Sequence, residues 1–316
     1  DTPGHADFGA ETERALEAMD YAVVLLDASA AVSARTAALF RLLRQWEKPV
    51  FFFINKMDLE GADIQRTLES VCGRLTEDVV FLDGQNPFSF DGAVGEFLAE
   101  RDEEMMEQYL GGGIDPDQGK EALARLMKKG QAFAAMAGSA LRDEGIPEFL
   151  QVLQELTRSE YDPQGMFQAA AYKVRRDGSG KRLVYLKVLS GILQPRDTVR
   201  VHEEEEKVNE LFQVMGSRLI PCRHAQAGDL IAVSGLKKAG CGTILGEDFG
   251  KKRPIRSVPA LEARVRAEDG TDSHRLLEVL KILEDEEPEL KAQSRKMADG
   301  SEQLCIQVMG AIQLEV

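Results

Sequence analysis

The sequence predicts a chain of several domains: a parallel α/β domain, then an all-β barrel, then the start of an α+β domain. Three observations support this prediction. In the first half, short apolar runs alternate with segments whose apolar residues have the spacing of a helix. Closely spaced β-rich segments follow from about residue 165, and the pattern of a strand, a helix and a strand comes after Pro254. A length of 316 residues leaves room for two or three domains.

Two continuous apolar runs in the first half, at 21–27 and 50–54, are typical of strands buried on both faces of a parallel sheet. Between them, apolar residues recur every four positions from Ala34 to Trp46. From Ile64 to Leu75 they follow the spacing of an amphipathic helix. Strands that alternate with helices in this way predict βαβ units.

A third apolar run, at 132–137, precedes a helix that begins at Ile146-Pro147, where proline is tolerated in the first turn. The interval 76–130 is less regular, and we expect one acidic helix there, around 94–110.

From about residue 165 the pattern changes to short strands separated by turn residues, which favours a small barrel. The expected strands are 167–174, 182–190, 198–202, 207–214 and 229–233. Beyond Pro254, a strand at 260–266, a helix ended by Pro288 and a strand at 303–308 indicate the first part of an α+β ferredoxin-like domain. We therefore expect domains at 1–160, 161–254 and 255–316.

The net charge of −15 lies entirely in the first half. Residues 1–160 hold 15 Lys+Arg and 30 Asp+Glu, whereas residues 161–316 hold 24 of each. The whole-chain charge therefore does not exclude a phosphate-rich partner. Residues 161–200 carry eight basic and three acidic side chains. The hairpin from Lys173 to Arg182 is our candidate for a nucleic-acid contact, with an ordinary solvated hairpin as the alternative.

Several classes of protein are excluded by composition. No apolar run approaches the roughly 18 residues of a membrane span, and no leader of the signal-peptide kind is present. The four cysteines lie far apart without Cys-x-x-Cys spacing, which argues against a zinc site and for reduced thiols. We expect a cytoplasmic protein with no membrane partner.

Three motifs stand at the predicted strand ends: Asp1-Thr2-Pro3-Gly4-His5, Asn55-Lys56-Met57-Asp58 and Ser139-Ala140. Ligands of open α/β sheets bind at the carboxyl ends of the strands. Each motif alone has an ordinary alternative, a turn for the first and a strand-capping loop for the second. Their joint occurrence, in this order and context, predicts a guanine-nucleotide site.

The first motif has the groups for the phosphate side of such a site. Asp1 can hold Mg²⁺ through a water molecule, because this ion keeps most of its waters. Gly4 lets the backbone approach a terminal phosphate. His5 can orient an attacking water, since phosphoryl transfer depends mainly on positioning and charge stabilisation. A capping or packing histidine is the alternative for His5.

The other two motifs have the groups for the base. Asp58 can accept two hydrogen bonds from the N1 and exocyclic amine of guanine, which adenine does not offer. Asn55 and Lys56 can brace the loop and cover the base. The backbone of Ser139 and Ala140 can bond the guanine oxygen.

These residues resemble the translational GTPases, through the stretches Asp1–Phe8 and Ile54–Asp58. Segments 190–199, 227–233 and 243–246 resemble the second domain of elongation factor G, and 308–316 resembles part of its third domain. Within this group the chain is most similar to the ribosomal protection proteins of tetracycline resistance. That choice depends on Phe52–Lys56, Asp58–Ile64, a compact 58–138 interval and Gln313 in a position where elongation factor G typically has histidine.

The resemblance implies a P-loop GTPase-type first domain that hydrolyses GTP with Mg²⁺ on the ribosome, releases tetracycline and then dissociates. It implies the ribosome and GTP or GDP as partners, and we expect no oligomer. Elongation factor G or a paralogue acting in translocation is the alternative. A non-catalytic ribosome-binding fragment is the alternative from another class.

One part of the family pattern is missing from these residues. No Gly-x-x-x-x-Gly-Lys-Ser/Thr occurs, so the phosphate-binding loop is absent. The chain starts at Asp1 rather than Met and stops at Val316, within the predicted third domain. We therefore expect a fragment cut at both ends. These 316 residues alone should bind GTP weakly at best and not turn it over.

Overall fold

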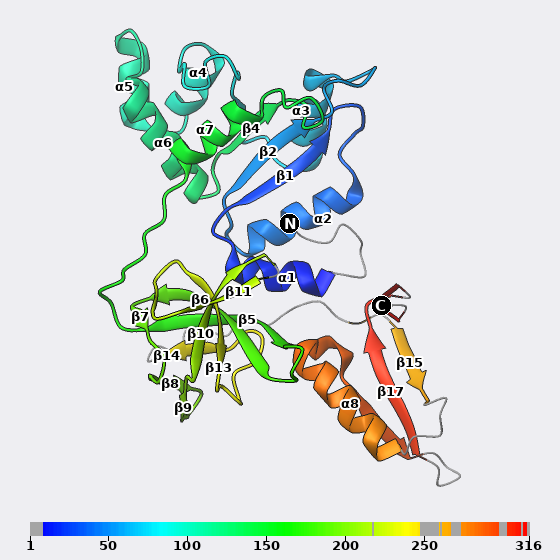
Figure 1. Ribbon diagram of the computed structural model, residues 1–316. Helices are drawn as coiled ribbons and strands as arrows, with labels where there is room; N and C mark the ends of the chain where they lie inside the picture. Colours follow the sequence, from blue (N-terminus) through cyan, green and yellow to red (C-terminus); the bar gives the residue numbers. More distant parts are fainter. Residues whose placement is uncertain are drawn as a thin grey trace. The chain divides into compact units, whose positions relative to one another are not determined.

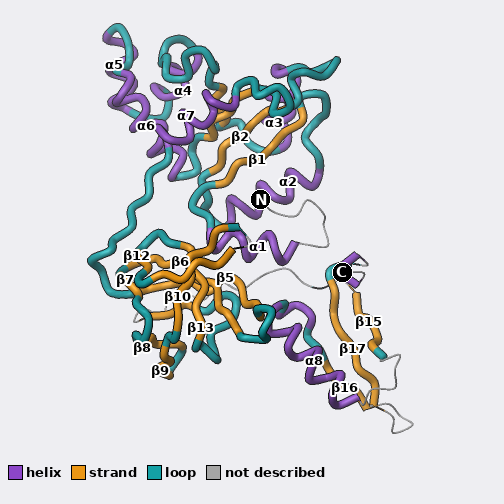
Figure 2. Tube along the Cα trace, viewed as in Figure 1, coloured by secondary structure: helices purple, strands orange, loops and turns teal. Residues whose placement is uncertain are grey.

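The computed structural model describes residues 9–216, 218–246, 259, 261–266, 273–296, 302–310 and 312–314. Contacts group the chain into two compact units, and Figures 1 and 2 show their elements. Unit 1 comprises residues 1–19 and 160–316, and unit 2 comprises residues 20–159. This grouping is not the three-domain division expected from the sequence, which stays a prediction.

Unit 2 is an α/β unit built on a parallel sheet of order β1-β2-β4-β3. Its elements, in chain order, are β1 (Ala22–Asp27), α2 (Ala34–Gln45), β2 (Val50–Asn55), α3 (Ile64–Arg74), β3 (Val79–Phe81), α4 (Ala93–Ala99), α5 (Glu103–Gly111), α6 (Pro116–Lys128), β4 (Phe133–Ala137) and α7 (Ile146–Leu156). The predicted βαβ arrangement is confirmed.

Strand β2 is buried on both faces by aromatic packing. Phe51 meets Phe149 of α7 edge-on, with ring centroids 6.3 Å apart, whereas the next residue, Phe52, packs against Phe40 of α2 at 5.6 Å. Successive side chains of a strand point to opposite faces, so these contacts fix which face each residue occupies. Each buried phenylalanine contributes roughly 1.5–3 kcal/mol. This packing holds Asn55 at the carboxyl end of the strand.

The interval between β3 and β4 differs from its prediction. The single acidic helix expected around 94–110 is two helices, α4 and α5, because the Asp102 carboxylate caps α5 by accepting from the Met105 N–H at 3.3 Å. Helix α6 was not expected, although its Asp115 cap followed by Pro116 is an ordinary helix start signal. Strand β3 has three residues, too few for periodicity to show.

Unit 1 contains an antiparallel sheet of order β11-β10-β13-β6-β5-β14-β8-β9 and a two-stranded pair, β12-β7. The strands are β5 (Gln168–Arg176), β6 (Arg182–Ser190), β7 (Ile192–Leu193), β8 (Thr198–Val201), β9 (Glu204–Lys207), β10 (Glu210–Met215), β11 (Arg218–Cys222), β12 (Ala225–Gln226), β13 (Leu230–Ser234) and β14 (Ile244–Gly246). Val201 of β8 and Leu211 of β10, near opposite ends of the sheet order, belong to one buried core. The sheet therefore curls around that core, as expected for the predicted all-β domain.

The last part of unit 1 is a three-stranded sheet, β15-β17-β16, with one helix packed against it. Its elements are β15 (Leu261–Val265), α8 (Ser273–Glu286), a 3-10 turn (Pro288–Leu290), β16 (Gln293–Lys296), β17 (Glu302–Val308) and a 3-10 turn (Ile312–Leu314). Leu280 of α8 shares a buried cluster with Ala292 and Leu304. The predicted strand, helix and strand are present, and β16 adds a strand that was not expected.

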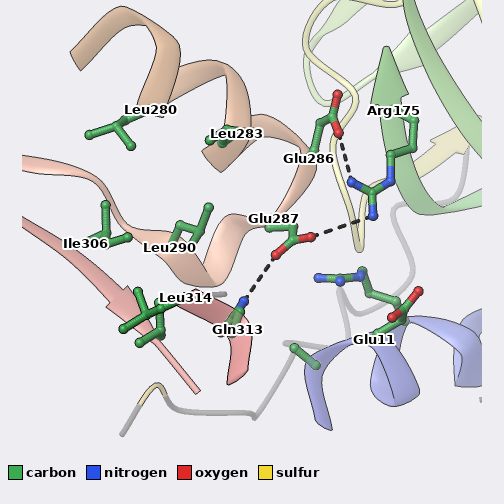
Figure 3. A pocket seen from close by; sticks show the side chains of 13 residues that line it. Glu11, Arg175, Leu280, Leu283, Glu286, Glu287, Leu290, Ile306, Gln313 and Leu314 are labelled. Atoms are coloured by element: carbon green, nitrogen blue, oxygen red, sulfur yellow. Dashed lines mark hydrogen bonds and ion pairs between the residues drawn. The ribbon is translucent and has the colours of Figure 1, made fainter. Parts of the chain in front are cut away.

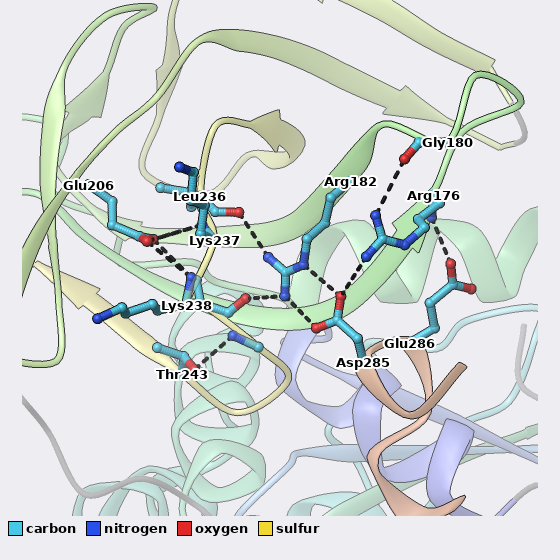
Figure 4. Close-up of polar contacts among 12 residues, drawn as sticks. Arg176, Gly180, Arg182, Glu206, Leu236, Lys237, Lys238, Thr243, Asp285 and Glu286 are labelled. Atoms are coloured by element: carbon cyan, nitrogen blue, oxygen red, sulfur yellow. Dashed lines mark hydrogen bonds and ion pairs between the residues drawn. The ribbon is translucent and has the colours of Figure 1, made fainter. Parts of the chain in front are cut away.

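Ion pairs join the end of α8 to the β5–β6 hairpin, as Figure 4 shows. The Arg182 guanidinium donates to both oxygens of Asp285, at 2.7 and 2.6 Å, and also to the carbonyls of Leu236 and Ala239. Arg175 pairs with Glu286 at 2.9 Å. We call the contacts of Arg175 and Arg182 with Asp285 and Glu286 the ionic joint.

A buried ion pair connects helix α1 (Gly9–Ala18) to the turn after α8. Arg14 Nη1 lies 2.9 Å from each oxygen of Glu289, and both side chains are less than a tenth exposed. Removing one partner of such a pair leaves a buried charge without compensation, which is strongly destabilising.

None of the helices among the described residues has the length and apolar character that a membrane span requires.

Candidate functional site

Two of the three predicted motifs meet at one edge of the parallel sheet. Strands β2 and β4 are neighbours, with Ile54 opposite Ala137, so the loops that follow them lie side by side. Backbone bonds tie these loops together. The Gly138 N–H donates to the Ile54 carbonyl at 2.9 Å, and the Met57 N–H donates to the Gly138 carbonyl at 3.2 Å.

Asn55 braces both loops with one side-chain oxygen. Its Oδ1 accepts from the Lys56 N–H at 2.8 Å and from the Ala140 N–H at 2.9 Å. The first bond holds Lys56 in a left-handed conformation with φ 67°, which is uncommon for a residue with a side chain. The bracing role predicted for Asn55 therefore has a geometric basis.

Asp58 and Ser139 are joined directly across the two loops. The buried Ser139 hydroxyl donates to Asp58 Oδ1 at 2.5 Å. This hydrogen bond lowers the pKa of Asp58, and the nearby Arg142 and Lys56 charges lower it further. Asp58 is therefore an ionised acceptor at neutral pH. A carboxylate has about four lone-pair sites, so one bond from Ser139 leaves capacity for a ligand.

The loop after β4 has its shape because two glycines allow close backbone approach. A Cβ at Gly138 would lie 2.2 Å from the Glu144 carbonyl oxygen and 2.9 Å from Phe53 Cζ. Gly145 has φ +75°, and a Cβ there would lie 2.6 Å from the Ala137 carbonyl oxygen. Reciprocal backbone bonds between Ser139 and Glu144, at 2.9 and 3.0 Å, close the loop.

Asp27 also lies at this edge, although it belongs to none of the three predicted motifs. It is the last residue of β1, opposite Asn55 in the register, and its Oδ2 lies 2.7 Å from Lys56 Nζ. Bonds from Lys56 and Ser29 lower the pKa of Asp27 to about 2. Its place at the end of the apolar run 21–27 was the signal that could have found it.

The predicted phosphate-side residues Asp1, Gly4 and His5 lie outside the described residues, and their roles stay predictions. In the described part of the chain, no three His, Cys, Asp or Glu side chains form a group that could hold a metal ion.

The basic hairpin proposed for nucleic-acid contact has most of its charge paired within the chain. Arg175 and Arg182 form the ionic joint, and Arg176 Nη2 lies 3.7 Å from Asp285. Lys181 pairs with Glu210, and Lys173 with Glu11 at 3.7 Å. These pairs favour an internal role for the hairpin over either of the two interpretations offered by the sequence.

A cavity of about 430 Å³ lies in unit 1 (Figure 3). Gln313, which stands where elongation factor G typically has histidine, lies on its wall and donates to Glu287 at 3.1 Å. The lining residues are Ala10, Glu11, Arg14, Arg175, Leu280, Leu283, Glu286, Glu287, Leu290, Ile306, Val308, Gln313 and Leu314.

The chain is similar to known proteins along its whole length. A family profile described as "Elongation factor Tu GTP binding domain" matches residues 1–159. All of the chain aligns with three curated relatives: an oxytetracycline resistance protein of Streptomyces rimosus at 30% identity, tetracycline resistance protein TetP of Clostridium perfringens at 26%, and elongation factor G of Dehalococcoides mccartyi at 27%.

The chain spans about half the length of these relatives, 52%, 51% and 55% in that order. A crystal structure of a Thermus thermophilus protein is similar in fold, with a TM-score of 0.81 at 23% identity. That similarity covers all of this chain and 54% of the other.

Proposed function

Because the chain belongs to the family of translational GTPases with an elongation factor Tu GTP binding domain, we propose that it is the guanine-reading and ribosome-facing part of a ribosome-dependent GTPase. The protein would bind GTP and hydrolyse it to GDP on the ribosome, in the cytoplasm. The relatives named for tetracycline and oxytetracycline resistance support ribosomal protection as the purpose of this hydrolysis.

One observation carries the proposal: the bonded cluster of Asn55, Asp58, Ser139 and Ala140 at the carboxyl edge of β2 and β4. Its ionised Asp58 carboxylate would accept hydrogen bonds from the N1 and exocyclic amine of guanine. The Ala140 N–H, which donates to Asn55 Oδ1 in this structure, would turn to the guanine oxygen, and the Lys56 stem would cover the ring. A bound base that lacks these donors is rejected, because it covers the polar groups of the site and leaves them unpaired.

The hydrolytic step is assigned to residues before unit 2. His5 would orient the water that attacks the terminal phosphate, Gly4 would let the backbone approach that phosphate, and Asp1 would serve Mg²⁺ through a bound water. Mg²⁺ would neutralise charge on the phosphates. The chemistry then needs positioning rather than a covalent intermediate.

Elongation factor G is the second candidate, because its identity of 27% to this chain lies between those of the two resistance proteins. Translocation would then replace drug release as the outcome of GTP hydrolysis.

The test uses the protein expressed from its complete reading frame in tetracycline-sensitive bacteria. We expect growth in tetracycline, and a matched elongation factor G expressed at the same level should give none. No growth in tetracycline with either protein would contradict ribosomal protection and favour translocation.

The catalytic part is tested with His5→Ala. This variant should bind GTP nearly as well as the wild type, while ribosome-stimulated hydrolysis slows by roughly 10²-fold or more because the attacking water is no longer positioned. Normal turnover in this variant would contradict the role of His5. A wild-type protein that binds GTP but shows no ribosome-stimulated turnover would instead support a non-catalytic ribosome-binding function.

A further inference from the structure

Asp27 stands beside the predicted base-binding loop without belonging to any of its motifs. Strands β1 and β2 are parallel neighbours, and Asp27 pairs in register with Asn55, the first residue of the loop. The Ala28 N–H donates to the Asn55 carbonyl at 2.9 Å, which fixes the two strand ends to each other. The Asp27 carboxylate is thereby held next to the residue that follows Asn55, which is Lys56.

Each oxygen of this carboxylate has a defined donor. Oδ1 accepts from the Ser29 N–H at 2.9 Å and from the Ser29 hydroxyl at 2.6 Å. Oδ2 accepts from Lys56 Nζ at 2.7 Å. The two Ser29 bonds set the direction of the carboxylate, so that Oδ2 is presented to the ammonium group rather than left to rotate.

Lys56 has the longest side chain in the loop Asn55–Asp58. Its side chain is 53% exposed, and its left-handed backbone donates its N–H to Asn55 Oδ1. A lysine side chain in this position would ordinarily sample many rotamers, and ordering it on ligand binding would weaken the affinity. The Asp27 contact removes much of that freedom in advance.

We infer that Asp27 is a positioning residue that holds the Lys56 ammonium at the end of β1, so that the lysine side chain is already ordered beside the base-binding loop before a guanine nucleotide arrives. Asp27 itself does not contact the nucleotide in this arrangement. The inference rests on the proposed function, because it takes the Asn55–Asp58 loop to bind guanine.

The test is a double-mutant cycle on the protein expressed from its complete reading frame, with fluorescently labelled GDP as the probe. Asp27→Asn keeps the size of the side chain and an acceptor for Ser29 but removes the charge that holds Lys56. We expect the dissociation constant for GDP to rise about 3- to 10-fold, mainly through faster release, as for a side chain that must be ordered on binding. Preference for guanine over xanthine should not change.

The cycle separates positioning from a structural role. In a Lys56→Ala background, Asp27→Asn should have no further effect on GDP release. Asp27→Glu, which keeps the charge, should recover part of the affinity. Ser29→Ala is the matched control. It loses the hydroxyl bond to Asp27 but keeps the backbone N–H bond that orients the carboxylate, and it keeps the ion pair, so it should change release less than about 2-fold.

Three results would overturn the inference. Unchanged GDP release in Asp27→Asn, together with changed release in Lys56→Ala, would refute the positioning role of Asp27. The proposed base site would still stand. An Asp27→Asn effect that persists in the Lys56→Ala background would show a structural role instead. A GDP release rate in Lys56→Ala equal to that of the wild type would show that Lys56 does not contribute to binding, and the inference would then fail as well. Melting temperatures of all variants verify that they are folded.

Discussion

Replacing Gly138 with alanine should damage both the stability of the chain and its base-binding loop. The added Cβ would lie 2.2 Å from a backbone oxygen, that of Glu144, and 2.9 Å from the buried Phe53 ring. A rotamer change cannot relieve the first contact, because a backbone atom makes it. The loop between β4 and α7 must therefore shift.

The size of the effect follows from these two contacts. Overpacking of a dense interior typically costs about 1–3 kcal/mol, and an unrelieved backbone contact belongs at the upper end of that range. About 2–3 kcal/mol corresponds to a fall in melting temperature of roughly 4–12 °C for a domain of this size. Displacement of Ser139 and Ala140 should also weaken GDP binding by about 10-fold or more, since positioning effects at sites are steep.

Gly73→Ala is the matched control for this prediction. Gly73 lies within helix α3, where an added Cβ meets nothing within 4 Å. Alanine is favoured over glycine in a helix by about 0.5–1 kcal/mol, so this variant should melt at the same or a slightly higher temperature. Thermal unfolding and GDP titration of both variants make the comparison. If Gly138→Ala matches Gly73→Ala in both measurements, the packing argument is wrong.

Two further predictions concern charge. Asp285→Asn should lower the free energy of unfolding by about 1–2 kcal/mol, and less at about 0.5 M than at 0.05 M NaCl, because it weakens the partly buried ionic joint. Urea titrations test this, with Glu284→Gln, whose partner Lys281 is in the same helix, as the control expected to change little. For Asp27, Lys56 and Ser29 lower the pKa to about 2 from 3.8. The stability that wild type holds over Asp27→Asn should therefore be complete above about pH 4 and disappear as the pH falls towards 2. An advantage unchanged at the acid end would contradict the ion pair.

The fold could be predicted where its signal is local. The run Val50–Ile54 is continuous and apolar because β2 is buried on both faces, and α7 begins at Ile146-Pro147 as expected. The break between α4 and α5 was missed because the Asp102 cap lies within an acidic stretch that hides it. Strand order and the contacts of α1 with the rest of unit 1 depend on residues far apart in the chain, which periodicity does not connect.

The base side of the candidate site could also be predicted, since its residues lie in two short motifs at strand ends. The sequence predicted Asn55, Asp58 and Ser139 as base-binding residues. In the structure the Ser139 hydroxyl bonds to Asp58, and Asn55 bonds to the neighbouring Ala140, so the two loops are joined. Asp27 could not be selected in this way, because its partner Lys56 is 29 residues away and only the parallel pairing of β1 with β2 brings them together. The basic side chains of the hairpin were predicted to be available to nucleic acid because their partners Asp285 and Glu286 lie more than 100 residues away in the sequence.

The central claim is that the loops after β2 and β4 read guanine through Asp58. The most direct test is the ratio of GDP to xanthosine diphosphate affinity in Asp58→Asn, measured on the protein expressed from its complete reading frame. Asp143→Asn, an exposed change on the same loop system, is the control. Exchange of an acceptor for a donor at Asp58 should reverse the preference, so that xanthosine diphosphate binds more tightly than GDP. An unchanged ratio in Asp58→Asn, equal to that of Asp143→Asn and wild type, would contradict the account.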